Sequence, residues 1–143
     1  MTAERIAFYG TLMSAAPPLP GAPRLGGLVE VLGPCVLPGT LYDLGSYPAL
    51  APSVGRVRGE LVRTVSDGAI AVLDAWEDYA VDDEPGSEYV RRSVRLLEPD
   101  LEVWTYEFNR PPAGLDVIAD GDWLAHVARR GVPPNAARGL RGA

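Results

Sequence analysis

The sequence contains no lysine, and this absence removes several kinds of chemistry. All 13 basic residues of the 143-residue chain are arginines. Schiff-base catalysis and the anchoring of pyridoxal phosphate both use a lysine amine. A phosphate-binding P-loop also uses a lysine. None of these mechanisms can operate through this chain.

Cysteine and histidine are nearly absent, with Cys35 and His126 as the single examples. One cysteine cannot form an internal disulfide, which favours a cytoplasmic setting. The two residues together cannot supply the four ligands of a tetrahedral zinc site. A Ser–His–Asp triad would depend on His126, and no Gly-x-Ser-x-Gly elbow occurs. We expect Cys35 to pack in the core and His126 to have a structural or surface role.

Long apolar runs and an excess of positive charge are missing as well. No apolar segment approaches the length of a membrane-spanning helix, and no charged-then-apolar leader opens the chain. The formal net charge is −6, whereas a nucleic-acid binder usually needs a basic face. We therefore expect a soluble intracellular protein without a nucleic-acid or membrane partner. The sequence carries no sign of a particular oligomeric state.

The chain is rich in residues that make turns, with 16 glycines and 14 prolines. This composition favours many short elements over long helices. A hydrophobic content of 47% in 143 residues is enough for one domain with its own core. We expect a single domain over residues 1–143, in which the tail from 132 to 143 is loose.

The hydrophobic pattern predicts several strands and two short helices. Strands are expected at residues 5–9, 27–42, 57–65, 89–97 and 101–108, with the last two antiparallel and breaks in the second at Gly33-Pro34 and Pro38-Gly39. Residues 44–50 are expected to form a tight turn. A helix is expected after Ser66 as its N-cap, and a closing helix that opens at Gly121-Asp122-Trp123 and runs through Arg130. This order predicts a mixed α+β fold, with a curved or barrel-like sheet and a helix against it.

Glu77 is the most informative polar residue. It follows Leu73 by four positions and Ile70 by seven, which places its side chain on the apolar stripe of the first helix. A glutamate is rarely buried without a partner, and burial raises the pKa of a carboxyl group towards the range useful for general acid/base catalysis. The alternative is that Glu77 lies at the edge of the stripe and pairs with an arginine.

Two further segments could contact a ligand. The segment from Phe8 to Leu12 ends a strand at Gly10, and such a loop can present backbone N–H groups to a carboxylate or an oxyanion. An ordinary turn is the alternative. On the strand that begins at Tyr89, Arg91 could bind a carboxylate or hold Glu77, whereas Arg92 is expected to be a surface charge.

Acidic residues are concentrated between Asp74 and Glu88. The run lacks the regular spacing of a calcium-binding loop, so we expect a solvated loop instead. Asp74 and Asp78 lie on helix faces beside that of Glu77, and we expect both to be solvated.

Seven segments, taken in order, resemble the motifs of the γ-glutamylcyclotransferase/AIG2-like family. They are Phe8-Tyr9-Gly10-Thr11-Leu12, the segment from Gly39 to Leu50, Val57-Arg58-Gly59-Glu60-Leu61, Leu73-Asp74-Ala75-Trp76-Glu77-Asp78-Tyr79, Tyr89-Val90-Arg91-Arg92, Trp104-Thr105-Tyr106 and Gly121-Asp122-Trp123. The resemblance extends from Ile6 to about Arg130. One departure is Asp78, which stands where the family commonly has glycine.

The resemblance implies a small, metal-free and cofactor-free enzyme. Members of this family cyclise a γ-glutamyl group to 5-oxoproline and release an amine or amino acid. In this chain the acid/base would be Glu77. The substrate-binding residues would be Tyr9, Gly10, Thr11 and Leu12, with Tyr89 as a pocket wall or hydrogen-bond donor.

Two other functions stay open at this point. The chain could be a non-catalytic module that keeps the fold and binds a small molecule. It could also be a different amide-processing enzyme, with Glu77 in the same role and another leaving group. Ligand binding without product release distinguishes the first alternative, and pocket shape distinguishes the second.

Overall fold

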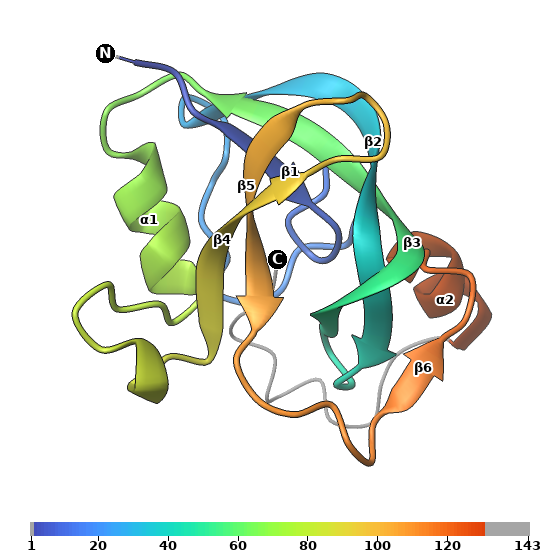
Figure 1. Ribbon diagram of the computed structural model, residues 1–143. Coiled ribbons are helices and arrows are strands. Elements are labelled where there is room, and N and C mark those ends of the chain that lie inside the picture. Colours follow the sequence, from blue (N-terminus) through green and yellow to red (C-terminus); the bar gives the residue numbers. More distant parts are fainter. Residues whose placement is uncertain (1, 131–143) are drawn as a thin grey trace.

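The computed structural model describes residues 2–130, which form a curved six-stranded sheet with two α-helices beside it (Figure 1). The elements in chain order are β1 (Arg5–Phe8), β2 (Val29–Asp43), β3 (Pro48–Thr64), α1 (Ala69–Trp76), the 3₁₀ turn η1 (Glu84–Gly86), β4 (Tyr89–Arg95), β5 (Glu102–Phe108), β6 (Asp116–Ile118) and α2 (Trp123–Arg130). The order of strands across the sheet is β4-β5-β1-β3-β2-β6. The expected α+β class with a mixed sheet is confirmed.

The first strand of the chain lies in the middle of the sheet. β1 pairs parallel with β5 and antiparallel with β3, and the other neighbouring strands are all antiparallel. Its residues Ile6, Ala7 and Phe8 are completely buried. A short strand can hold this central place because apolar side chains on both of its faces are covered. The loop that follows β1 therefore starts from the interior of the protein.

Bulges bend the long β2–β3 hairpin. The pairing register shifts between Val31 and Gly33 and again between Pro38 and Thr40, where the sequence predicts breaks. A bulge increases the local twist and bends its strand. An isolated bridge then joins Val36 of β2 to Glu98 in the β4–β5 turn. The sheet is consequently barrel-like in its curvature, although its strands do not close into a complete barrel.

The largest differences from the predicted strands concern β3 and β6, whereas the ends of the other strands differ by one or two residues. β3 begins at Pro48 rather than at residue 57, so the expected turn at 44–50 ends at Tyr47. Residues 48–56 become extended because they pair with the end of β2. β6 was not expected, and its three residues are a strand because they add to the edge of β2. The loose tail expected at 132–143 lies outside the described residues.

The start of α1 also differs from expectation. Ser66 is not the N-cap; Gly68 occupies that position, and no side chain caps the helix. The backbone carbonyl of Ser66 instead accepts a hydrogen bond from the N–H of Ala69, at 3.3 Å. Ser66 thus belongs to the turn that leads into the helix. Within residues 2–130, no helix is both long and apolar enough to cross a lipid bilayer.

The way α1 ends determines the backbone conformation of Asp78, the residue after Glu77. The N–H of Tyr79 donates to the carbonyl of Asp74, at 2.9 Å, and the N–H of Asp78 donates to that of Ala75, at 3.2 Å. These two bonds form a Schellman motif, whose C′ residue adopts a left-handed conformation. Asp78 occupies that position with φ of 57°. Glycine adopts this conformation without steric penalty, so Asp78 fits the expected family pattern in conformation but not in residue type.

Candidate active site

Glu77 ends α1 with its carboxyl group enclosed by the protein. The residue is the helix C-cap, and its exposed fraction is 0%. Neither of its carboxyl oxygens has a hydrogen-bond partner among the described residues. Burial, followed by the negative charges of Glu88 and Asp74, raises the pKa of Glu77 well above its ordinary value. The predicted core-facing position is confirmed, and the alternative of an arginine partner is not observed.

Two buried tyrosines, Tyr9 and Tyr89, lie close enough to Glu77 for its charge to act on them. The hydroxyl of Tyr9 donates to the carbonyl of Tyr106, at 2.5 Å, and that of Tyr89 donates to the carbonyl of Pro48, at 2.6 Å. Burial raises the pKa of Tyr9 and of Tyr89, and the charge of Glu77 raises both further. The structure therefore brings together three residues that the sequence selected: Glu77, Tyr9 and Tyr89.

The remaining residues of the predicted loop follow Tyr9 directly. Gly10, Thr11 and Leu12 are buried, and the carbonyl of Gly10 accepts a hydrogen bond from the N–H of Met13, at 3.1 Å. The segment is thus a tight turn that leads out of the central strand β1. Because Gly10 directly follows Tyr9, the backbone of this turn begins beside Tyr9 and Glu77.

A carboxylate on β3 anchors this turn, and sequence reasoning did not select it. Glu60 accepts hydrogen bonds from the backbone N–H of Ser14, at 2.7 Å, and from its hydroxyl, at 2.6 Å. Glu60 stands opposite Phe8 in the β1–β3 pairing, so it reaches the far end of the turn. The adjacent Gly59 has no room for a side chain, because a Cβ atom there would lie 2.6 Å from the Phe8 carbonyl oxygen. The Gly-Glu pair was the sequence signal for this anchor.

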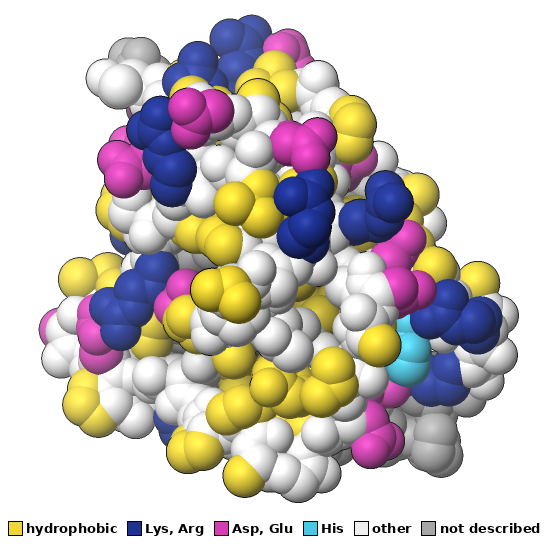
Figure 2. All heavy atoms as spheres, turned by 45° about the vertical axis from the view of Figure 1, so that its right-hand side comes forward, with side chains coloured by type: hydrophobic (Ala, Val, Ile, Leu, Met, Phe, Trp, Pro, Cys, Tyr) yellow, Lys and Arg dark blue, Asp and Glu magenta, His cyan; other side chains and the backbone are white. Residues whose placement is uncertain are grey.

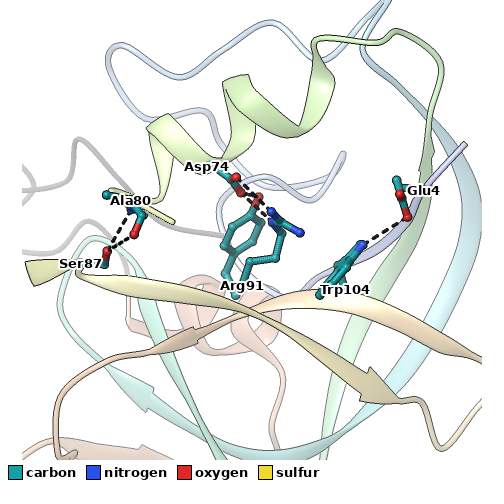
Figure 3. A network of polar contacts seen from close by, with 7 residues as sticks. Glu4, Asp74, Ala80, Ser87, Arg91 and Trp104 are labelled. Atoms are coloured by element: carbon teal, nitrogen blue, oxygen red, sulfur yellow. Dashed lines mark hydrogen bonds and ion pairs between the residues drawn. The ribbon is translucent and has the colours of Figure 1, made fainter. Parts of the chain in front are cut away.

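Asp74 lies one turn before Glu77 and has a different environment, shown in Figure 3. Arg91 on β4 donates from Nε to Asp74 Oδ1, at 2.9 Å, and the hydroxyl of Tyr106 donates to the same oxygen, at 2.7 Å. The Arg91 guanidinium also lies 4.6 Å from the centre of the Trp104 ring. The prediction that Asp74 is solvated is wrong, since these partners bury it between the helix and the sheet. Arg91 binds Asp74 rather than Glu77.

The acidic loop and its neighbours are otherwise as expected. Arg92 is half-exposed and forms a long ion pair with Glu84, at 3.5 Å. Glu88 is the exception in this loop: its Oε1 atom is buried without a hydrogen-bond partner among residues 2–130. It is also the largest source of charge acting on Glu77. Sequence reasoning missed Glu88 because it ends a run of exposed acids.

The helix α2 is attached to the sheet through Asp43. His126 Nε2 lies 2.7 Å from Asp43 Oδ2, and Arg130 Nη1 lies 2.5 Å from the same oxygen. The face of the molecule that contains α2 carries basic and acidic side chains side by side, with the histidine among them (Figure 2). The expected structural role of His126 is confirmed.

The single cysteine lies in the core of the described region. Cys35 is 4% exposed and packs in the core as expected, and this burial raises the pKa of its thiol to about 12. In the part of the chain that the structure describes, no three His, Cys, Asp or Glu side chains gather as metal ligands would.

Comparison with known proteins matches this arrangement to one family. Residues 6–125 match the family model described as γ-glutamyl cyclotransferase, AIG2-like. The match includes Glu77, the loop after β1 and the strand that begins at Tyr89. The chain belongs to the γ-glutamylcyclotransferase, AIG2-like family.

Individual members of the γ-glutamylcyclotransferase, AIG2-like family agree with this assignment. The chain is 38% identical over 84 residues to the γ-glutamylcyclotransferase family protein YtfP of Escherichia coli, which is 59% of this chain and 66% of YtfP. The aligned region therefore spans about two thirds of the relative's length.

Solved structures share the family fold. The solution structure of E. coli YtfP superposes with a TM-score of 0.62 at 32% identity, over 85% of this chain and 97% of YtfP. An AIG2-like protein from Mus musculus superposes with a TM-score of 0.65 at 20% identity, over 86% of this chain and 89% of the mouse protein. An uncharacterised protein from Pyrococcus horikoshii gives a TM-score of 0.65 at 22% identity, over 89% and 95%. The last two likenesses concern the fold alone.

Proposed function

We propose that the protein cyclises a γ-glutamyl group to 5-oxoproline and releases an amine or amino acid, with Glu77 as the general acid/base. The observation that carries the proposal is the environment of Glu77. Its carboxyl group is completely buried, and both oxygens are without hydrogen-bond partners in the described chain. Burying a carboxyl group without hydrogen-bond partners is unfavourable for folding. A role in proton transfer to a bound ligand would explain why Glu77 is nevertheless buried in this way.

The first step of the proposed reaction is a proton transfer to a base. The α-ammonium of a γ-glutamyl compound must lose a proton before its nitrogen can attack the γ-carbonyl carbon. The raised pKa of Glu77 makes its carboxylate a stronger base than an exposed one. The raised pKa also keeps the carboxyl group of Glu77 protonated over a wider pH range while no ligand is bound. The approach of the cationic ammonium favours the ionised form, so the substrate itself promotes the active state of Glu77.

The bonds then exchange within one bound molecule. The nitrogen forms a bond to the γ-carbon, the carbonyl π electrons move to oxygen, and their return breaks the original amide bond. Two protons leave the attacking nitrogen, and the departing amine gains two, so Glu77 ends as it began. Because the attack is intramolecular, correct positioning supplies much of the acceleration.

The tyrosines and the turn after β1 would position the substrate. Tyr9 and Tyr89 are close enough to Glu77 for its charge to raise the pKa of both, so we assign them to the wall of the site. The backbone N–H groups of Gly10, Thr11 and Leu12 would face the α-carboxylate or the developing oxyanion. Glu60 would hold the turn in place through Ser14.

The test is the release of 5-oxoproline from a panel of γ-glutamyl amines, γ-glutamyl amino acids and glutathione, in buffer without metal ions. The proposed chemistry is proton transfer alone, so we expect release without added metal. We expect Glu77→Gln to abolish release and Glu102→Gln, which changes an exposed glutamate of β5, to keep it. Full turnover by Glu77→Gln on a confirmed substrate would contradict the mechanism. Ligand binding without release would identify a binding module instead.

A further inference from the structure

Glu88 is held firmly between the end of α1 and the end of β5. Its backbone N–H donates to the carbonyl of Asp78, at 3.1 Å, and its carbonyl accepts from the N–H of Asn109, at 2.9 Å. It directly precedes Tyr89, the first residue of β4. These contacts fix the backbone of Glu88 next to the helix turn that carries Glu77.

The carboxyl group of Glu88 is poorly satisfied. Its Oε2 atom accepts one long hydrogen bond from the hydroxyl of Tyr47, at 3.3 Å. Its Oε1 atom is buried and has no partner among the described residues. The nearby Arg110 directs Nη1 to the carbonyl oxygens of Ser87 and Asn109, at 3.1 and 2.9 Å.

Glu88 also lies on the wall of a hollow that opens to the outside. The hollow has a volume of about 310 Å³, and its lining consists of Leu44, Asp78, Gly86, Glu88, Phe108 and Arg110. Asp78 directly follows Glu77, and the charge of Glu88 acts on Glu77 more strongly than any other charge does. A small molecule in the hollow would contact Glu88, whose backbone N–H is hydrogen-bonded to Asp78, the residue after Glu77.

Three buried carboxyl oxygens consequently lack a hydrogen-bond donor within residues 2–130: both of Glu77 and one of Glu88. A primary ammonium group carries three N–H donors and one positive charge. It would satisfy these acceptors and offset the repulsion between the two carboxylates. A neutral amide would not offset this repulsion, and an anion would neither donate to these oxygens nor offset the repulsion.

We propose that Glu88 receives the α-ammonium of the γ-glutamyl group, and that Glu88 and Glu77 together form a subsite for primary ammonium groups. The proposal rests on the proposed function and adds a residue and a selectivity to it. Glu88 retains the ammonium while Glu77 exchanges protons with it. The α-nitrogen is thereby fixed near the base, and compounds without a free α-ammonium are excluded.

The test is binding calorimetry in the Glu77→Gln background, which prevents turnover. The two ligands are γ-L-glutamyl-ethylamide and glutaric acid mono-ethylamide, which differ only in the α-ammonium. We expect at least a tenfold preference for the ammonium compound, lost on the additional change Glu88→Gln and retained with Glu88→Asp. The matched control is Glu84→Gln, a half-exposed glutamate of the same loop, and we expect it to keep the preference.

The ratio between two ligands on one protein does not depend on how much of a variant is folded. Equal binding of the two compounds, no binding of either, or a preference that survives Glu88→Gln would overturn the proposal. A preserved preference together with no 5-oxoproline release by the unaltered protein would refute the cyclotransferase reaction and leave the ammonium subsite standing. The two proposals can therefore fail separately.

Discussion

Two acidic residues at the last turn of α1, Asp74 and Glu77, are both buried, but they differ in their hydrogen-bond partners. Asp74 is bound by Arg91 and Tyr106, whereas Glu77 has no hydrogen-bond partner among the described residues. A paired buried charge links elements together, but an unpaired one is unfavourable for folding. The difference indicates that Asp74 holds the helix on the sheet and that Glu77 serves a ligand.

Glu77→Gln tests the chemical side of this comparison and should have the largest effect. We expect turnover to fall by about 10²- to 10⁴-fold, the usual contribution of a general acid/base. The variant should fold at least as well as the unaltered protein, because it loses a buried acid with no partner. Steady-state kinetics and thermal unfolding on the same preparations measure both. A variant that is inactive because it is unfolded would contradict the comparison.

Asp74→Asn tests the structural side. We expect the free energy of unfolding to fall by about 2–3 kcal/mol, because Arg91 loses its charged partner between the helix and the sheet. Urea denaturation measures this change. The control is Asp67→Asn, an exposed residue just before α1, which should change stability by less than about 0.5 kcal/mol. Equal effects of the two variants would show that Asp74 is not a structural link.

The pH dependence of stability should separate Glu77 from its neighbours. In the folded protein the pKa of Glu77 lies above its ordinary value of 4.5, so the folded state binds more protons than the unfolded state. The free energy of unfolding should therefore decrease as the pH rises from about 4.5 towards the folded pKa. Glu77→Gln removes this loss, and its stability advantage should grow with pH. Urea denaturation at pH 5, 6, 7 and 8 measures the trend, and a constant difference would contradict it.

Asp78→Gly should have the smallest effect, and it concerns the backbone that places Glu77. Asp78 has φ of 57°, which glycine adopts more readily than aspartate does. We expect a gain in stability of about 0.5–1 kcal/mol with little change in turnover. Thermal unfolding provides the measurement. A loss of stability would show that the Asp78 side chain contributes more than its backbone strain removes.

Helical periodicity was sufficient to place Glu77 but not Asp74. The spacing from Leu73 predicts that Glu77 points into the core, and its burial confirms this. Asp74 was expected to be solvated because its partners are distant in sequence: Arg91 is 17 residues later and Tyr106 is 32 residues later. A pattern within one helix contains no information about which strands pack against it.

The strands show the same limit. The breaks in β2 were predictable from Gly33-Pro34 and Pro38-Gly39, because these residues disturb a regular strand wherever it lies. The early start of β3 and the existence of β6 were not predictable, since both depend on pairing with β2. Glu88 was missed for a similar reason: the acidic residues before it are mostly exposed, and its backbone contacts come from Asp78 at the end of α1 and Asn109 after β5.

The parallel pairing of β1 with β5 also determines when the site can exist. Ile6 of β1 pairs with Trp104 of β5, which lies almost a hundred residues later in the chain. Contacts between such distant segments form late, because a long loop must close before they are gained. The hydrogen bond from the Tyr9 hydroxyl to the Tyr106 carbonyl can therefore form only once β5 has been synthesised. A growing chain that already contains Glu77 would still lack this anchor for Tyr9.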